Sequence, residues 1–502
     1  MAISDPPTTT APPGTASRSL TGSLGVGSII FMVVAAAAPL TVVAGSVPIG
    51  ILAGNGSGYP ATYLVSAAIL AFFAVGFVAM TPHVPQAGAF YSYISRGLGR
   101  PLGLGAAMLA LLTYVTIQGA VFGYVGQAIN DLLGRYGVAS PPWWVWTMVV
   151  IAAIGVLGYR HIDLSSKVLG LLLVAEVAIV VVLDVAVVAQ GGPEGYSAGI
   201  VTAADVTSGS PALGLMFAIA GFIGFEATAV FRDEAREPER TIPRATYLAL
   251  AIIGVFYAVS SWVIVTAWGD SAVVERAAAD PGSMVVETTE TYLGTVAADV
   301  LNVLLVTSLF ACALSFHNVL ARYYFNLGNA GVLHSRLGAA HDRHASPSSA
   351  SLAQSVISAA VIAVCALAGL DPVLEVFTWL SGIATVGIVA LMLLTCVAVL
   401  VFFRRTRVDT RPWQTVIAPG LGLLGLVAVL VVLVQNLPLL MGGSTALGVG
   451  AGVLLLAALV AGPVLAKYRP DAAALTDTAL VDTTLVDTTL VDTTLTDPAL
   501  EA

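Results

Sequence analysis

The chain is a succession of long apolar runs separated by short polar connections. Twelve of these runs are close to or above the roughly 20 residues that a helix needs to cross a lipid bilayer. Because lipid offers no hydrogen-bond partners to the backbone, each run is predicted to be a helix. The predicted spans are 24–50, 60–80, 101–129, 143–159, 166–190, 211–231, 245–268, 297–326, 351–370, 374–403, 413–436 and 441–466. The pattern predicts an all-α integral membrane protein with about 12 transmembrane helices.

Composition agrees with this fold class. Of the 502 residues, 58% are hydrophobic and only 10% are charged, whereas soluble domains carry about 25% charged residues. The net charge of −9 comes largely from 471–501, which holds seven acidic residues and no Lys or Arg. The acidity therefore belongs to a tail and not to a binding surface, and we expect the lipid bilayer, not nucleic acid, as the macromolecular environment.

The basic residues predict the orientation. If the N-terminus is cytoplasmic, the segments on that side hold eighteen of the twenty Lys and Arg residues, and only Arg135 and Arg276 lie outside. Cytoplasmic connections of membrane proteins are enriched in Lys and Arg. We therefore expect a multi-pass protein of the plasma (cytoplasmic) membrane with both termini in the cytoplasm.

Two spans contain helix-breaking residues near their midpoints. The first contains Ala35-Ala36-Ala37-Ala38-Pro39-Leu40-Thr41, and the sixth contains Gly221-Phe222-Ile223-Gly224-Phe225-Glu226. Proline removes a backbone donor and clashes with the preceding turn, and each glycine lowers helix propensity by about 1 kcal/mol. For either span alone, a simple kink or close helix packing at small residues explains the sequence equally well.

Taken together, the two interruptions suggest an internal repeat. They occur in spans one and six, the first members of two successive blocks of five helices. Because five is odd, the second block would run upside down relative to the first. Interrupted helices in matching positions of inverted repeats mark the central site of secondary transporters, where freed N–H groups can hold a carboxylate and freed carbonyls an amine or cation.

The predicted organisation has five parts. Residues 1–22, rich in Pro, Thr and Ser, form a disordered cytoplasmic lead-in and not a signal peptide. Spans one to five with the broken span six occupy 23–231, the rest of the second repeat occupies 232–403, and two additional helices occupy 404–466. The acidic segment 467–502, with a Leu-Val-Asp-Thr-Thr repeat, is predicted to be a disordered cytoplasmic tail.

Polar residues of other spans could line the same site. Tyr114 and Gln118 are four residues apart in span three and so share a helix face. The candidate substrate-binding residues are Ala36, Ala37, Ala38, Pro39, Leu40, Thr41, Tyr114, Gln118, Gly221, Phe222, Gly224, Phe225, Glu226, Ser308 and Ser381. Hydroxyl groups in membrane helices also bond their own backbone, so each hydroxyl has a purely structural alternative.

Ionisable side chains at membrane depth are costly and therefore candidates for function. Glu176 lies near the middle of span five and Glu226 follows the break in span six, so both are candidates for proton coupling. For Glu226 a hydrogen-bond anchor of the broken backbone, or a part that closes a gate, is an equally good interpretation. Asp184 lies nearer the outer end of span five and could face water, and His317 in span eight is more typical of a packed polar residue.

Other chemistries find no support in the sequence. Cys312, Cys365 and Cys396 each lie inside an apolar run without metal-ligand spacing. The six histidines are scattered, and no Walker-type phosphate loop is present. We therefore expect no cofactor, no metal and no enzymatic activity.

Three segments resemble the amino acid–polyamine–organocation (APC) superfamily. Gly224-Phe225-Glu226 followed by 231–245, which includes Arg240-Thr241-Ile242-Pro243-Arg244-Ala245, is similar to that family's sixth helix and following cytoplasmic loop. Pro82 to Tyr93 is similar to the loop before helix three, and Ser315 to Leu333 to helix eight. The resemblance covers about 20–466 and implies a LeuT-like 5+5 inverted repeat plus two C-terminal helices.

The resemblance also implies roles for particular residues. The first helix of the family usually reads Gly-x-Gly-Ile-Phe and holds the substrate carboxylate, but this chain has Ala37-Ala38-Pro39-Leu40 at that place. Residues Phe222 to Glu226 match a segment that contacts the substrate, with Glu226 resembling a gating acid. Glu176 stands where some members carry a proton-coupling lysine, and an acid there could instead favour a cation.

The sequence thus predicts a secondary active transporter for a small-molecule substrate, an amino acid or related amine, that works by alternating access with H⁺ as coupling ion. A polyamine/amino acid exchanger is one alternative, and an uncoupled facilitator or channel is another.

Overall fold

The computed structural model describes residues 24–84, 90–139, 141–160, 166–226, 228, 235–329, 331–338 and 347–468. Within these ranges the chain is helical, and the single pairing of extended backbone is a bridge between Leu24 and Ala235. The α-helices are α1 (Val26–Ala37), α2 (Pro39–Thr41), α3 (Val47–Gly50), α4 (Tyr59–Met80), α5 (Phe90–Leu98), α6 (Arg100–Gly134), α7 (Trp143–Arg160), α8 (Ser166–Gln190), α9 (Ala203–Val206), α10 (Pro211–Ala220), α11 (Pro238–Trp268), α12 (Val273–Ala279), α13 (Met284–Leu293), α14 (Thr295–Asn329), α15 (Ser348–Leu367), α16 (Thr378–Thr406), α17 (Ala418–Leu440) and α18 (Thr445–Tyr468).

Short turns of other helix types extend several of these elements. The π-helical turns are η1 (Val42–Ser46), η2 (Ile51–Asn55), η7 (Pro372–Phe377) and η8 (Trp413–Ile417), and the 3₁₀ turns are η3 (Gly56–Gly58), η4 (Thr81–His83) and η6 (Ser335–Gly338). The helical path that begins at Pro39 therefore continues through η1, α3 and η2 to Asn55.

The described helices account for all twelve predicted spans. In the described part of the chain, nine helical stretches are long and apolar enough to cross a membrane, and one of these, Val26–His83, contains the first two spans. The shorter apolar helices Trp143–Tyr159 and Pro211–Ala220 correspond to spans four and six. The predicted fold class, an all-α multi-pass membrane protein, is confirmed.

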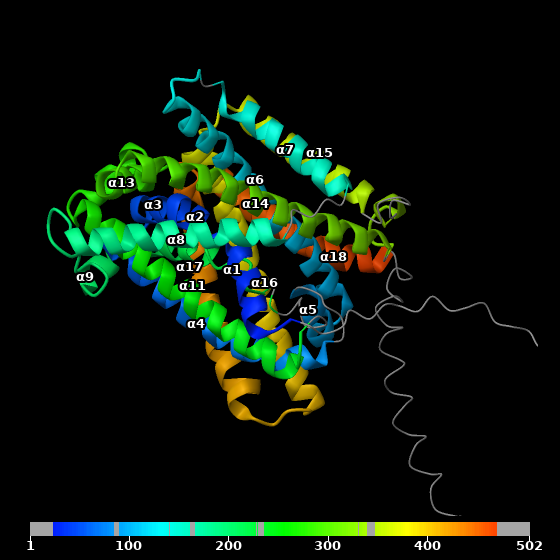
Figure 1. Cartoon of the computed structure of the whole chain (residues 1–502). Helices are drawn as coiled ribbons and strands as arrows, with labels where there is room; N and C mark the ends of the chain where they lie inside the picture. The colour runs from blue at the N-terminus through cyan, green and yellow to red at the C-terminus, as the bar shows by residue number, and fades with distance from the viewer. Residues whose placement is uncertain are drawn as a thin grey trace, which may run out of the picture.

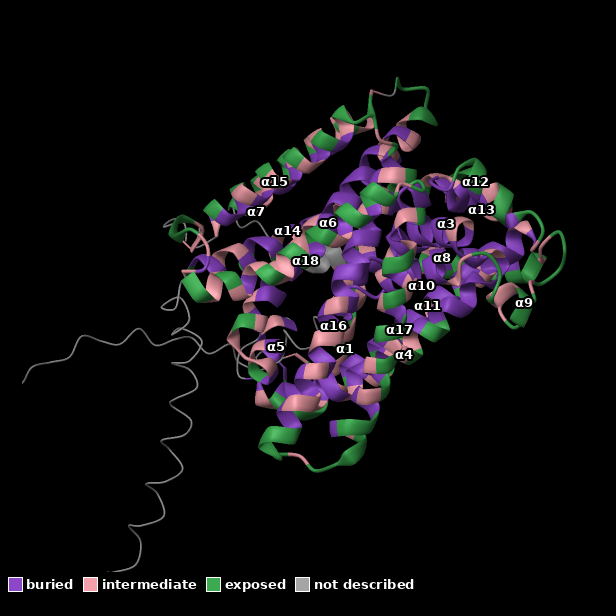
Figure 2. Cartoon of the chain, turned by 180° about the vertical axis from the view of Figure 1, so that it is seen from behind, coloured by how far each residue is buried: buried purple, intermediate pink, exposed green. Residues whose placement is uncertain are grey.

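The helices differ greatly in how much of their surface is covered. In the most apolar window of α6, 78% of the residues are buried inside the protein, compared with 17% in α18. Figure 2 shows buried residues concentrated in the middle of the bundle, while α7 and α15 carry exposed residues and lie together along one edge. The centre of the bundle, which contains α6 and α16, is therefore the place where a polar site would be shielded from lipid.

The connecting elements gather on opposite sides of the bundle. In Figure 1, α9 and α13 lie at the left and α5 lies at the right, and Figure 2 shows the same separation from behind. These are the connections that the basic residues assign to opposite faces of the membrane. Of the predicted terminal segments, 1–22 lies outside the described residues, as does 467–502 apart from the last turn of α18, which ends at Tyr468.

Candidate functional site

The first helix breaks at Ala38. Helix α1 ends at Ala37, Ala38 adopts a left-handed conformation (φ 45°, ψ 69°), and the helical path resumes at Pro39. A left-handed backbone is unfavourable for a residue with a Cβ atom, and here the proline that follows cannot continue the preceding helix. The break occurs at the predicted place, and its residues are buried, Ala38 at 4% exposure and Leu40 at 0%.

The sixth span breaks at its glycines. Helix α10 starts after Ser210, whose side chain accepts a bond from Leu213 N–H, and it ends at Ala220. The chain then turns through Gly221–Gly224, and Gly224 has φ +113°, which side chains with a Cβ rarely adopt. The regular helix is therefore shorter than the predicted 211–231, and most of the residues after Glu226 in that range lie outside the described part of the chain.

The two breaks touch each other. A methyl group in place of the Gly224 hydrogen would lie 3.3 Å from Ala36 Cβ, and one at Gly221 would lie 3.0 Å from Val42 Cγ1. Glycine at both positions therefore leaves room for this close approach of the two spans. The structure brings together the two segments that the sequence singled out separately.

Glu226 bonds the interrupted backbone of its own span. Its Oε2 accepts a hydrogen bond from the Gly224 N–H at 2.8 Å, and its Oε1 accepts one from Tyr114 Oη on α6 at 3.0 Å. A buried polar group that lacks a partner costs about 1–3 kcal/mol, so these bonds stabilise the break. The geometry is that of the backbone anchor considered for Glu226, with Tyr114 joined to it.

Glu176 connects three spans through hydroxyl groups. Ser308 Oγ on α14 donates to Glu176 Oε2 on α8 at 2.8 Å, and Thr41 Oγ1 at the break donates to Ser308 Oγ at 3.2 Å. All three residues are at most 5% exposed. No donor among the described residues bonds the second oxygen, Glu176 Oε1, which is therefore available to a solute or a proton.

The resemblance noted in the sequence agrees with a comparison with protein families. A family model described as amino acid permease matches residues 24–456. The chain belongs to the amino acid permease family. This match extends from the start of α1 into α18, includes both interrupted spans, and confirms the predicted APC superfamily membership.

Curated relatives of this permease are distant. The low-affinity putrescine importer PlaP of Escherichia coli (strain K12) is 23% identical over 263 residues, which cover 50% of this chain and 55% of that protein. The branched-chain amino acid permease BcaP of Lactococcus lactis subsp. cremoris (strain MG1363) is 24% identical over 226 residues, or 42% and 49% of the two chains. The permease thus spans about half the length of the curated relatives it matches.

Two tyrosines complete the site and were not among the predicted residues. Tyr257 Oη on α11 donates to the carbonyl oxygen of Ala37 at 3.2 Å, and Tyr124 Oη on α6 donates to that of Ala44 at 3.0 Å. The Tyr257 hydroxyl satisfies a carbonyl group next to the break, and the Tyr124 hydroxyl satisfies one in the π-helical turn after it. A tyrosine inside an apolar run is a weak signal, because its hydroxyl must find some partner wherever the residue is buried.

The two phenylalanines of the sixth break point toward aromatic neighbours. The Phe222 ring lies 6.3 Å from the Tyr257 ring and 6.5 Å from that of Tyr63, and the Phe225 ring lies 6.0 Å from that of Phe73. These contacts pack the break against α4 and α11, which holds Gly224 against α1.

Two of the predicted polar residues, Gln118 and Ser381, make no hydrogen bond to either break among the described residues. Gln118 Nε2 donates to Ala313 O at 2.9 Å, and its Oε1 accepts bonds from Gln354 Nε2 and Ser358 Oγ at 2.6 and 3.0 Å. This cluster joins α6 to α14 and α15. Ser381 on α16 is buried, and its hydroxyl has no partner among the described residues.

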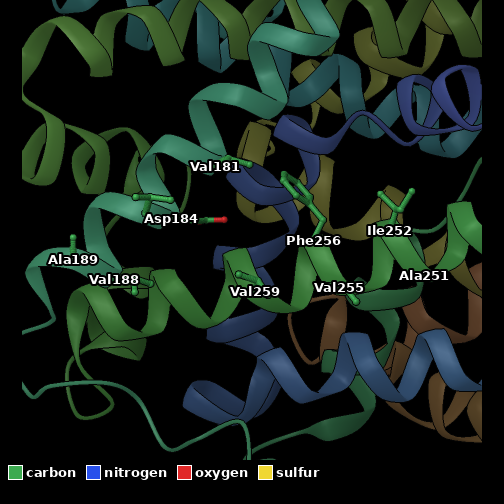
Figure 3. A pocket seen from close by; sticks show the side chains of 10 residues that line it. Val181, Asp184, Val188, Ala189, Ala251, Ile252, Val255, Phe256 and Val259 are labelled. Atoms are coloured by element: carbon green, nitrogen blue, oxygen red, sulfur yellow. The ribbon is translucent and has the colours of Figure 1, made fainter. Parts of the chain in front are cut away.

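Two other ionisable residues of the spans, His317 and Asp184, face elsewhere. His317 lies 2.8 Å from Ser351 Oγ on α15. Asp184 Oδ2 accepts a bond from Ser260 Oγ at 2.8 Å and lines an apolar hollow of about 830 Å³ between α8 and α11. Figure 3 shows the Asp184 carboxylate among Val181, Val188 and Val259, so Asp184 does not share the surroundings of Glu176.

Parts of the family-like loops lie outside the described residues, namely 85–89 before α5 and 229–234 after the sixth break. The described remainder begins at Ala235, and Arg236 N–H donates to Leu24 O at 2.8 Å. The loop after span six is thus attached to the start of span one.

Proposed function

We propose that this permease is a secondary active transporter that moves an amino acid or related amine across the plasma membrane by alternating access, with H⁺ as the coupling ion and both termini in the cytoplasm. The observation that carries the proposal is the contact between the two interrupted helices, with Glu176 bonded to one of them through Ser308. The names of the two relatives, a putrescine importer and a branched-chain amino acid permease, support this substrate range.

Proton coupling is assigned to Glu176. The carboxylate of Glu176 accepts a hydrogen bond from the Ser308 hydroxyl, which in turn accepts one from the Thr41 hydroxyl. The charge state of Glu176 therefore affects how firmly α2 is attached to α8 and α14. A charged carboxylate in a buried site is unfavourable. A bound cationic solute compensates its charge, and protonation removes the charge. Binding of solute and proton at this position therefore biases the same contact between helices.

Glu226 and Tyr114 are assigned to opening and closing of the site. Their bond joins the break in span six to α6, and Glu226 also holds the Gly224 N–H. Movement of α6 away from the break would separate Tyr114 from Glu226 while leaving the Gly224 bond intact. The pair therefore acts as a closing contact, and Glu226 keeps its role as backbone anchor.

A pH jump across proteoliposomes tests the proposal. Purified permease is reconstituted at pH 7.5 or at about pH 6, the external pH is set to the other value, and uptake of radiolabelled solute is followed under each gradient with and without a protonophore. We expect transient accumulation above the external concentration under one of the two gradients, and we expect the protonophore to abolish it. Uptake that only reaches the external concentration, with or without the pH gradient, would indicate the uncoupled facilitator instead.

A further inference from the structure

The hydrogen-bond donors of the first break are few. Ala38 N–H already donates to Ala35 O at 3.2 Å, and Pro39, the first residue of the resumed helix, has no N–H. Only Leu40 and Thr41 remain as donors in the first turn, where a helix otherwise offers several N–H groups to an anion. The break is therefore poorly equipped to hold a carboxylate.

The second break offers even fewer donors. Gly221, Phe222 and Ile223 N–H donate to carbonyl groups of α10, and Phe225 N–H donates to Phe222 O. The Gly224 N–H is bonded by Glu226. Every N–H from Gly221 to Phe225 thus has an acceptor within the break or the helix before it.

Acceptors and negative charge dominate instead. Helices α1 and α10 both end at the breaks, and the C-terminal end of a helix carries partial negative charge. Among the residues whose burial the structure describes, the buried acidic and basic side chains are Glu176, Glu226 and His317, and no Lys or Arg is buried. His317 faces Ser351 on α15, so none of these buried side chains is a cation directed at the breaks.

We infer that the solute carries an ammonium group and lacks a carboxylate, so that it is an alkyl amine or diamine and not an amino acid. Its ammonium group is held by the free Oε1 of Glu176, next to the hydroxyls of Ser308 and Thr41. A carboxylate in the same place would face another carboxylate and have too few donors. This inference rests on the proposed function, because it assumes that the breaks form the transport site.

Two matched pairs of compounds test it, since the members of each pair differ only by the carboxylate: putrescine with ornithine, and isoamylamine with leucine. Uptake of each radiolabelled compound into proteoliposomes is measured under pH gradients of both directions, and binding is measured by thermal stabilisation. We expect the amine of at least one pair to be bound and taken up with at least tenfold higher apparent affinity than its amino acid.

Two variants add a readout at the site. Glu176→Gln is expected to lower the apparent affinity for the amine more than tenfold. The control Asp184→Asn, in the same helix but facing the apolar hollow of Figure 3, is expected to leave this affinity unchanged. Preferred uptake of the amino acid in both pairs would overturn the inference and leave the transport function standing. If compounds bind but none of them is taken up, the transport function is overturned. If none of the four compounds binds or is taken up, both the inference and the transport function are contradicted.

Discussion

At the scale of single residues, Glu176 is the buried acid with unused hydrogen-bonding capacity. Glu226 has a partner for each of its oxygens, whereas one oxygen of Glu176 has none among the described residues. The two acids looked alike in the sequence, because each lies near the middle of an apolar run. Their surroundings separate them into a backbone anchor and a group that can exchange a proton or bind a cation.

The Glu176→Gln substitution is expected to abolish accumulation against a gradient while retaining downhill exchange. The amide can still accept the Ser308 hydroxyl but cannot gain or lose a proton at neutral pH, so solute movement loses its link to the proton. Concentrative uptake and counterflow are measured on the same proteoliposomes. Asp184→Asn is the control, and undiminished accumulation by Glu176→Gln would reject the assigned role.

Gln118 shows where residue-level prediction was incomplete. Its spacing from Tyr114 indicated a shared helix face, yet its amide is bonded to α14 and α15. Helix periodicity relates neighbours within one helix but does not say which helix a polar face meets. Substrate contact by Gln118 stays a prediction, with the cluster as a structural explanation for its burial.

The Gln118→Ala substitution is expected to lower Tm and leave the KM for solute within about twofold of wild type. Removing the amide leaves the buried groups of Gln354 and Ser358 with fewer partners, which costs about 1–3 kcal/mol. Thermal unfolding in detergent and uptake kinetics check the two parts. An unchanged Tm with a strongly raised KM would instead place Gln118 in the substrate site.

At the scale of elements, the interruption of the first span was predictable and its form was not. Pro39 made a break near the midpoint predictable, because proline cannot continue a helix without losing a bond. The left-handed residue is Ala38, a residue type that gives no such signal. Tyr257 was also missed, since it bonds Ala37 across 220 positions of sequence, and no local pattern encodes such a pairing.

Substitutions at Ala38 test the form of the break. Ala38→Gly is expected to retain transport and raise Tm slightly, because glycine adopts φ 45° without the cost of about 1–2 kcal/mol that other residues incur. Ala38→Val is expected to abolish uptake, since a β-branched side chain is strongly unfavourable in this conformation. The control is Ala35→Val, on an exposed helical position of α1. Equal uptake by both valine variants would contradict the left-handed break.

At the scale of the whole molecule, the fold class followed from the sequence because the lengths of apolar runs and the placement of basic residues are set by the bilayer. All twelve runs correspond to helical segments of the described chain. How the helices pack depends on contacts between residues distant in sequence, such as Gly224 with Ala36. The division into two inverted repeats and the cytoplasmic location of the termini stay predictions.

Cysteine labelling tests the orientation of the chain. The three native cysteines are buried, so background labelling is expected to be low. Val138→Cys lies in the exposed connection after α6, and Val408→Cys lies in the one after α16. A membrane-impermeant maleimide is expected to label the first in intact cells and the second only after permeabilisation. The reverse pattern would invert the topology.

We propose that the two interrupted helices together hold the solute. The most direct measurement is an electron cryomicroscopy structure of the permease with the transported compound bound. We predict solute density in contact with both the Ala37–Thr41 break and the Gly221–Glu226 break, with its charged group beside Glu176. Solute density confined to another place, such as the apolar hollow between α8 and α11, with the two breaks unoccupied, would show that the breaks are not the transport site.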